Sequence, residues 1–207
     1  MTQILDWTWM PNSATFEPSN FVHPHTFGKQ AHEHRSPHWV FDMTLPPVGN
    51  KDKRIISALL AKSRGTAVVN VFDPTTPYPA YYERAMKNGS SIDIIPNVTI
   101  KATDGATSSL TVSGSVGDVI TVDDPIAFTN AGVRHYYRAQ ETLVLDGTDQ
   151  ALEVYLTPRV DLTGLTIIAE RHKPTHRFNV KGTANPTDAD GFTVFNLKGV
   201  EFWGAIT

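Results

Sequence analysis

The 207-residue chain contains no cysteine, which excludes disulfide scaffolds, cysteine-ligated zinc sites, CxxC redox motifs and thiol nucleophiles. Charge is also scarce: Asp, Glu, Lys and Arg make up 19 % of the residues, against about 25 % in typical domains. The net charge of −3 shows no basic excess, so we predict no specific nucleic-acid binding. Low charge combined with 10 % aromatic residues predicts a surface that is partly covered by partner chains.

Long apolar runs are missing as well. No stretch approaches the ~18 consecutive apolar residues of a membrane-spanning helix, so we predict no membrane span. The first ten residues, MTQILDWTWM, lack the positive and apolar regions of a secretory signal. These features predict a protein that is made and kept in the cytoplasm. The chain length suits one large domain or two small ones.

Catalytic signatures are absent too. The sequence contains no GxSxG, Walker, GxGxxG or HExxH motif. The adjacent carboxylates Asp123 and Asp124 fall in a turn and are expected to be solvated, and Arg134–Arg138 is expected to be a packed strand. We therefore predict that the protein is not an enzyme and has no catalytic, cofactor-binding or metal-binding residues and no cofactor.

Histidine is concentrated near the N-terminus, in the segment His23–His38. On a strand, residues two apart point to the same face, so each His-x-His pair would aim two rings at one point, as a metal site requires. We favour surface or interface rings, and a cupin-like metal enzyme stays open as an alternative. Its ligands would come from His23, His25, His32 and His34.

The first half of the chain predicts strands and one amphipathic helix. Residues 38–45 alternate, with Trp39, Phe41 and Met43 on one face of a strand. Residues 52–63 predict a helix that Asn50 can cap. Its apolar stripe, expected to cover the strand, consists of Ile55, Ile56, Leu59 and Leu60. A short helical turn fits Tyr81–Lys87.

From residue 91 onward, Thr, Val, Ser, Gly and Asp predominate, and short strands alternate with turns. Many short strands at close spacing predict a small sandwich or barrel. The predicted strands are Val98–Ala102, Ser109–Val112, Val119–Val122, Arg134–Gln140, Thr142–Leu145, Ala151–Leu156 and Thr166–Glu170. The fold class is therefore mainly β, or β-rich α+β.

Two blocks of residues carry a resemblance to a known family. The first block comprises Trp39–Pro47, the Asp52–Ser63 helix, Arg64-Gly65-Thr66 and the strand that ends in Phe72-Asp73-Pro74. The second comprises Leu110–Gly114, Gly117–Ile120, Arg134–Arg138, Leu152–Arg159 and His176–Val180. In this order, over roughly residues 36–180, the chain resembles the minor tail proteins of tailed bacteriophages, notably the distal-tail (Dit-like) hub proteins.

The resemblance implies a nested organisation. Residues 1–100 and 173–207 would form a sheet or β-sandwich domain with one amphipathic helix, the ring-forming hub or belt domain. Residues 101–172 would form an inserted small β-barrel domain.

The resemblance also implies a role. The protein would be a structural subunit of the distal tail, baseplate or tail tip, in a ring that connects the tail tube to the tip. Its partners would be copies of itself, forming a hexamer, together with the tail tube protein and other tail-tip or hub proteins. It would be located in the virion tail and assembled in the bacterial host cytoplasm.

A carbohydrate-binding β module for host-surface recognition is the main alternative. Aromatic rings on the outside of a small barrel can stack on sugar rings. The tyrosines expected to be exposed for this purpose are Tyr78, Tyr81, Tyr82, Tyr136 and Tyr137.

Overall fold

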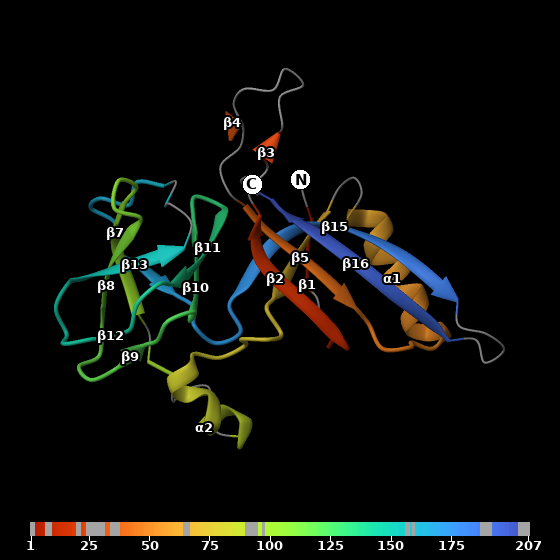
Figure 1. The fold of residues 1–207 in the computed structure, drawn as a ribbon, viewed down its shortest axis with the longest axis horizontal. Helices are drawn as coiled ribbons and strands as arrows, with labels where there is room; N and C mark the ends of the chain where they lie inside the picture. The colour runs from red at the N-terminus through yellow and green to blue at the C-terminus, as the bar shows by residue number, and fades with distance from the viewer. Residues whose placement is uncertain are drawn as a thin grey trace. The chain divides into compact units, whose positions relative to one another are not determined.

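The computed structural model describes residues 3–6, 10–19, 22–23, 32–33, 38–63, 67–89, 95–96, 98–155, 158, 160–186 and 192–202 (Figure 1). The fold is mainly β, as the sequence predicts. None of the helices in these ranges has both the length and the apolar character needed to cross a membrane.

The chain divides into two compact units, and the second interrupts the first. The first unit comprises Met1–Asn70 and Arg177–Phe202, and the second begins at Val71 and runs to His176. The resemblance places the boundaries of the inserted domain at 100/101 and 172/173. The structure assigns residues 71–100 and 173–176 to the second unit instead of the first. The difference has a physical cause, because residues 73–82 bond to the barrel: Asp73 pairs with Arg138, and Lys173 N donates to Pro77 O.

The first unit is a six-stranded sheet. Its strand order is β1 (Gln3–Asp6), β6 (Ala67–Phe72), β15 (Thr175–Pro186), β16 (Thr193–Glu201), β5 (His38–Thr44) and β2 (Ser13–Ser19). β1 lies parallel to β6, whereas the β15–β16, β16–β5 and β5–β2 pairs are antiparallel. A separate two-stranded ribbon pairs β3 (Val22–His23) with β4 (His32–Glu33).

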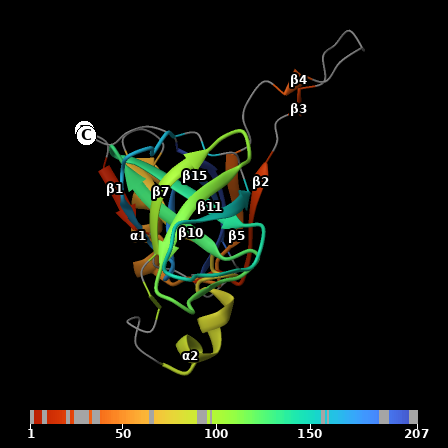
Figure 2. The same ribbon diagram turned by 90° about the vertical axis from the view of Figure 1, so that its left-hand side faces the viewer.

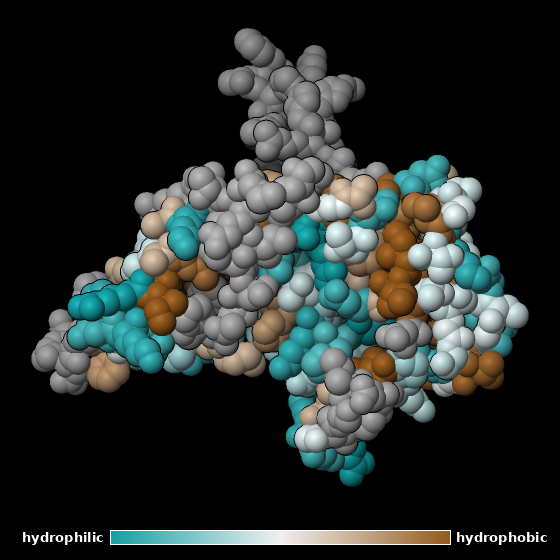
Figure 3. Space-filling model, turned by 180° about the vertical axis from the view of Figure 1, so that it is seen from behind, coloured by the Kyte–Doolittle hydropathy of each residue, from teal (hydrophilic) through white to brown (hydrophobic). Residues whose placement is uncertain are grey.

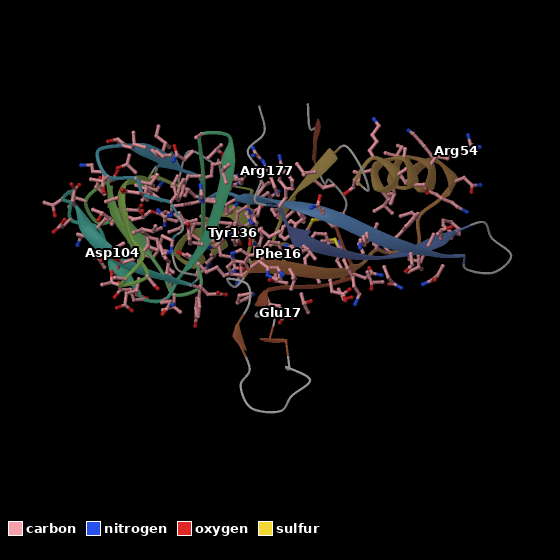
Figure 4. The ribbon with its side chains drawn as sticks, turned by 90° about the horizontal axis from the view of Figure 1, so that it is seen from above. Phe16, Glu17, Arg54, Asp104, Tyr136 and Arg177 are labelled. Atoms are coloured by element: carbon pink, nitrogen blue, oxygen red, sulfur yellow. The ribbon has the colours of Figure 1, made fainter. Side chains whose placement is uncertain are left out.

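Alternation along β5 and β2 separates the two faces of this sheet. Trp39, Phe41 and Met43 are buried, which confirms the predicted face of β5. In β2, Phe16 is buried and Glu17 is exposed, and Figure 4 labels both side chains. The Phe178 ring of β15 contacts Phe16 and Phe41 edge-on, with ring centroids 5.3 and 4.9 Å apart. The buried face thus joins β2, β5 and β15 through aromatic packing.

The helix α1 (Asn50–Ser63) covers this buried face, as predicted, but in a different rotation. Ile56, Leu59 and Leu60 are buried, whereas Ile55 is 46 % exposed, so the prediction that Ile55 belongs to the stripe is wrong. The reason is Ser63, whose hydroxyl accepts a 2.9 Å hydrogen bond from Val180 N in β15. Successive helical residues are about 100° apart, so turning Ser63 and Ile56 to the sheet turns Ile55 away.

Pro18 in β2 lies at the edge of the sheet. Trp39 N in β5 donates to Glu201 Oε2 on the β16 side, and Thr44 O accepts from Asn12 N on the β2 side. Odd-numbered residues of β5 therefore direct their backbone groups to β16, and even-numbered ones to β2. Because Pro18 is opposite Trp39, its missing N–H falls at the outer edge of β2, which no strand among the described residues pairs with. Such a proline weakens unspecific edge-to-edge pairing.

Gly182 in β15 lets α1 lie close to the sheet. A Cβ there would come within 2.6 Å of Leu197 Cδ2 and 2.8 Å of Leu60 Cδ1. We expect Gly182→Val to push α1 off β15 and to lower the free energy of unfolding by about 2–3 kcal/mol, measured by urea denaturation. The matched control is Lys181→Val on the exposed face of the same strand, with an expected change within about 0.5 kcal/mol. Equal losses in the two variants would contradict this packing.

The second unit is a six-stranded sheet that is nearly closed into a barrel (Figure 2). Its order is β10 (Pro125–Asn130), β11 (Val133–Ala139), β13 (Gln150–Tyr155), β8 (Ser109–Gly114), β7 (Val98–Asp104) and β14 (Ile167–Ala169). The two ends meet where Ala127 and Glu170 exchange backbone hydrogen bonds of 3.1 and 2.7 Å. β9 (Val119–Ile120) and β12 (Leu143–Val144) form a small ribbon beside it.

The inside of the barrel holds one apolar cluster, which includes Ile100, Leu110, Phe128 and Leu152. Before the barrel strands come a 3-10 turn, η1 (Ala80–Tyr82), and a short helix, α2 (Glu83–Lys87), which confirm the helical turn predicted at 81–87. No residue of η1 or α2 is buried. Something other than apolar burial must therefore hold this segment.

Candidate functional site: a buried charge network in the barrel unit

The second unit contains a network of buried charges that joins the segment 73–82 to the barrel. Its acidic members follow β6 or precede β9 and β10, and its arginines lie in β11 and directly after β14. Buried charges are rare unless they are paired. The network consists of the buried Asp73, Asp118, Asp124, Arg138 and Arg171, together with the half-buried Tyr82 and the exposed Asp123.

Arg171 and Asp118 form the most deeply buried pair. Arg171 Nη1 lies 2.5 Å from Asp118 Oδ2, and the two side chains are 1 % and 0 % exposed. Arg171 Nη2 also donates to Val119 O at 2.7 Å. Asp118 Oδ1 accepts from Tyr82 Oη at 2.7 Å and from Val119 N at 2.8 Å. Each charge is therefore held by its partner and by at least one further hydrogen bond, although Arg171 Nε has no partner among the described residues.

Tyr82 connects η1 to this pair. Its ring lies 5.9 Å from the Arg171 guanidinium carbon. Burial and the hydrogen bond to Asp118 raise the pKa of Tyr82 to about 12. The phenol therefore stays neutral and remains a hydrogen-bond donor at physiological pH.

Arg138 forms the second centre of the network. It donates to Asp73 and, at 2.7 Å, to Asp123 Oδ2. Asp73 in addition accepts from Thr75 N at 2.8 Å and Thr75 Oγ1 at 2.7 Å, and from Thr76 Oγ1 at 3.1 Å. The loop that follows β6 is thus folded around one carboxylate, which Arg138 neutralises.

Asp124 holds the start of η1. Its carboxylate accepts from Ala80 N and Thr121 N, each at 2.8 Å. Burial raises the pKa of Asp124 above its usual value. The expectation of a solvated Asp123–Asp124 pair is wrong for Asp124, which is 2 % exposed, because the turn folds under the 73–82 segment rather than into solvent.

Aromatic and cation–π contacts also join the segment that enters the second unit, at Phe72 and Tyr78, to the segment that leaves it, at His172 and Lys173. Lys173 Nζ lies 5.7 Å from the ring centroids of both Phe72 and Tyr78, and the Tyr78 and His172 rings are 5.4 Å apart. A cation between two rings stabilises their arrangement by about 1 kcal/mol. The entering and leaving segments of the insertion are therefore fastened to each other as well as to the barrel.

The hydrogen bonds and ion pairs of the network hold chain segments of the second unit together. Each of its carboxylates accepts a hydrogen bond from a guanidinium, a backbone N–H or a hydroxyl, so each connects two parts of the unit. In the part of the chain that the structure describes, no group of three His, Asp or Glu side chains could hold a metal ion.

Two of the five histidines in the segment His23–His38 lie outside the described residues, and the side chains of two more are not described. His25 and His34 are not described, and of His23 and His32 only the backbone pairing between β3 and β4 is. His38 is buried in β5, and His135 and His176 are buried in the second unit. The metal-site alternative on His23, His25, His32 and His34 therefore remains a sequence-based hypothesis.

The tyrosine platform expected for sugar binding is wrong for two of its five members. Tyr136 and Tyr137 are 2 % and 4 % exposed, because all residues from Arg134 to Ala139 are buried in β11. This burial confirms the packed strand predicted for Arg134–Arg138. Tyr81 is 61 % exposed, whereas Tyr78 and Tyr82 are half-buried.

Sequence reasoning missed the network. Its two arginines lie in or beside apolar strands, at Arg138 and Arg171, where a charge needs a buried partner. An arginine in such a position indicates a buried acidic partner. The sequence does not show which acid this is, because the partners of Arg171 and Arg138 lie 53 and 65 residues away in the chain. No family model matches the chain, and the search of curated proteins gave no match.

Proposed function

We propose that the protein is a structural subunit of a bacteriophage tail, a distal tail or hub protein of the baseplate or tail tip that connects the tail tube to the tip. The observation that carries the proposal is the nested architecture. The chain leaves the first unit through β6 and returns through β15, and these two strands are neighbours in the sheet.

The order of the elements supports the proposal. A strand, β5, is followed by the long helix α1, a return strand β6, an inserted barrel, and the strands β15 and β16. The resemblance to distal-tail proteins implies this same order. An insertion that begins and ends at adjacent strands leaves the sheet of the first unit intact, and that sheet is then available for assembly.

The site chemistry supports a structural role. Buried ion pairs fix one arrangement of a loop because any other arrangement leaves a charge unpaired. A subunit that repeats around a ring needs such fixed surfaces, since a heterologous interface closes only at one rotation. A hexamer, with the tail tube protein and other tail-tip or hub proteins as further partners, is the assembly that the resemblance implies. The place of action is then the virion tail, assembled in the bacterial host cytoplasm.

Mass spectrometry of purified particles tests the proposal. Particles made by the virus that encodes this chain are expected to contain it in several copies per tail, retained after removal of the capsid. Tail preparations that form and infect without the chain would contradict the proposal.

A further inference from the structure

The two units carry opposite excess charge. Residues 71–176 hold 13 Asp and Glu against 8 Lys and Arg, whereas the rest of the chain holds 8 acidic and 10 basic residues. On the first unit, the basic side chains concentrate on α1, which carries Lys51, Lys53, Arg54 and Lys62 against the single acid Asp52. Separate surfaces of opposite sign on one chain allow copies to contact each other head to tail.

The solvent side of α1 carries an unpartnered basic face, consisting of Lys51, Arg54, Ile55, Ala58 and Lys62. All five are exposed, and they share one side because each lies three or four residues from at least one of the others. Figure 4 labels Arg54 on the side of α1 away from the sheet. Among the described residues, no acidic group forms an ion pair with Lys51, Arg54 or Lys62.

This face also offers apolar surface. Ile55, which is 46 % exposed, lies at the border of the basic face that adjoins the buried stripe of α1. On the opposite flank of α1, next to Arg54, a groove of about 280 Å³ lies between α1 and the strands β15 and β16, lined by Ser57, Leu60, Ala61, Gly182, Ala184 and Phe195. Figure 3 shows this side of the first unit, where hydrophilic and hydrophobic atoms adjoin over α1. An apolar patch bordered by charge is typical of a protein-binding surface.

The matching surface is an acidic rim on the barrel, consisting of Asp104, Glu141, Glu153 and Asp161. Asp104 in β7 and Glu153 in β13 are both paired with Ser109 in β8, so these acids lie on the two strands that flank β8, about 10 Å apart by the usual strand spacing. Glu153 N donates to Glu141 Oε1 at 2.9 Å. Thr103 donates to Val160 O, which brings Asp161 to the same rim.

Hydrogen bonds hold two carboxylates of the acidic rim in place, and no ion pair with a described residue neutralises the rim. Ala106 N donates to Asp104 Oδ1 at 2.8 Å, and Thr163 N donates to Asp161 Oδ1 at 2.9 Å. These bonds hold the carboxylates in place, which reduces the entropy lost when a partner binds. No lysine or arginine among the described residues pairs with the rim, since Lys101 pairs with Asp149 instead.

From this complementarity we infer that the basic face of α1 binds the acidic rim of a second copy of the chain. The contact is heterologous, because each copy offers one surface of each kind, and it repeats from copy to copy. It deepens the proposed function, on which it rests, by identifying the two surfaces that close the ring. Both surfaces are exposed, so the contact is expected to weaken as salt increases.

Sedimentation of the full-length chain with charge-changing variants tests the contact. A helix variant, Lys51→Glu/Arg54→Glu, and a rim variant, Asp104→Asn/Glu153→Lys, are each expected to self-associate at least about tenfold more weakly than the parent chain. Asn at position 104 can still accept from Ala106 N. An equimolar mixture is expected to regain 1:1 association, because the rim of the helix variant and the helix of the rim variant are both unaltered.

The control variant, Lys181→Glu/Arg84→Glu, makes the same charge change as the helix variant, but at exposed positions outside both surfaces. It is expected to associate like the parent chain. Circular dichroism checks that every variant is folded. The inference is overturned if the helix variant associates normally, if the control weakens as much, or if the mixture stays dissociated. A parent chain that stays monomeric at all concentrations also overturns it, while mass spectrometry of particles decides separately whether the chain is a tail subunit.

Discussion

Arg171→Met is expected to lower the free energy of unfolding of the barrel unit by about 3–5 kcal/mol, the usual loss when one partner of a buried ion pair is removed. The side chain of Asp118, which is fully buried, would lose its guanidinium partner. Urea denaturation measures the loss. Hydrogen exchange should report faster exchange in residues 73–89, because Tyr82 bonds to the same carboxylate.

Two further variants separate this explanation from a general effect of removing a basic residue. Lys87→Met removes a surface pair with Glu83, whose side chains are 65 % and 44 % exposed, and is expected to cost less than about 0.5 kcal/mol. Arg171→Met/Asp118→Asn is expected to recover part of the loss, since an amide oxygen can still accept from Tyr82 and Val119 N. Equal losses in the Arg171 and Lys87 variants would contradict the assignment.

The second unit is expected to lose stability in mild acid because of His135. Its buried ring stacks on Phe128 at 5.0 Å, and Nδ1 has no hydrogen-bond partner among the described residues. Burial, with the nearby charges of His176 and Arg134, lowers the pKa of His135 to about 4. Below the usual pKa of about 6.5, the unfolded chain binds a proton that the folded chain does not. The contribution of His135 to the loss of stability between pH 7.5 and pH 4.5 is therefore expected to be about 2.5 kcal/mol.

His135→Phe isolates this contribution. Phenylalanine keeps an aromatic ring against Phe128 and has no titrating group, so the variant should lose about 2.5 kcal/mol less than the parent over the same pH range. Comparing the two chains is necessary because Asp124, whose pKa is raised, favours the folded state in acid. The same pH dependence in both chains would show that His135 is not the group responsible.

Most of the barrel could be predicted because its strands alternate between apolar and polar residues and end at turn signals. The strand expected at Val98–Ala102 is β7, and that expected at Ala151–Leu156 is β13. The helix at 52–63 was predictable because it combines an apolar stripe with polar flanks. In each case the sequence pattern of the segment itself determines its secondary structure, so the segment can be predicted without knowledge of its partners in the fold.

What could not be predicted depends on partners far away in the chain. β10, Pro125–Asn130, was missed because it starts with a proline directly after a turn and is buried at four successive positions, without alternation. The rotation of α1 depends on a bond from Val180 to Ser63, 117 residues apart. The charge network likewise depends on Asp73 meeting Arg138 and on Asp118 meeting Arg171, which only the folded barrel brings together.

Imaging of labelled tail particles tests the central claim most directly. A small tag on the chain, in particles of the virus that encodes it, should appear as a ring with rotational symmetry at the distal end of the tail tube. A label that is missing from the tail, or scattered along it without symmetry, would contradict a ring-forming distal tail subunit.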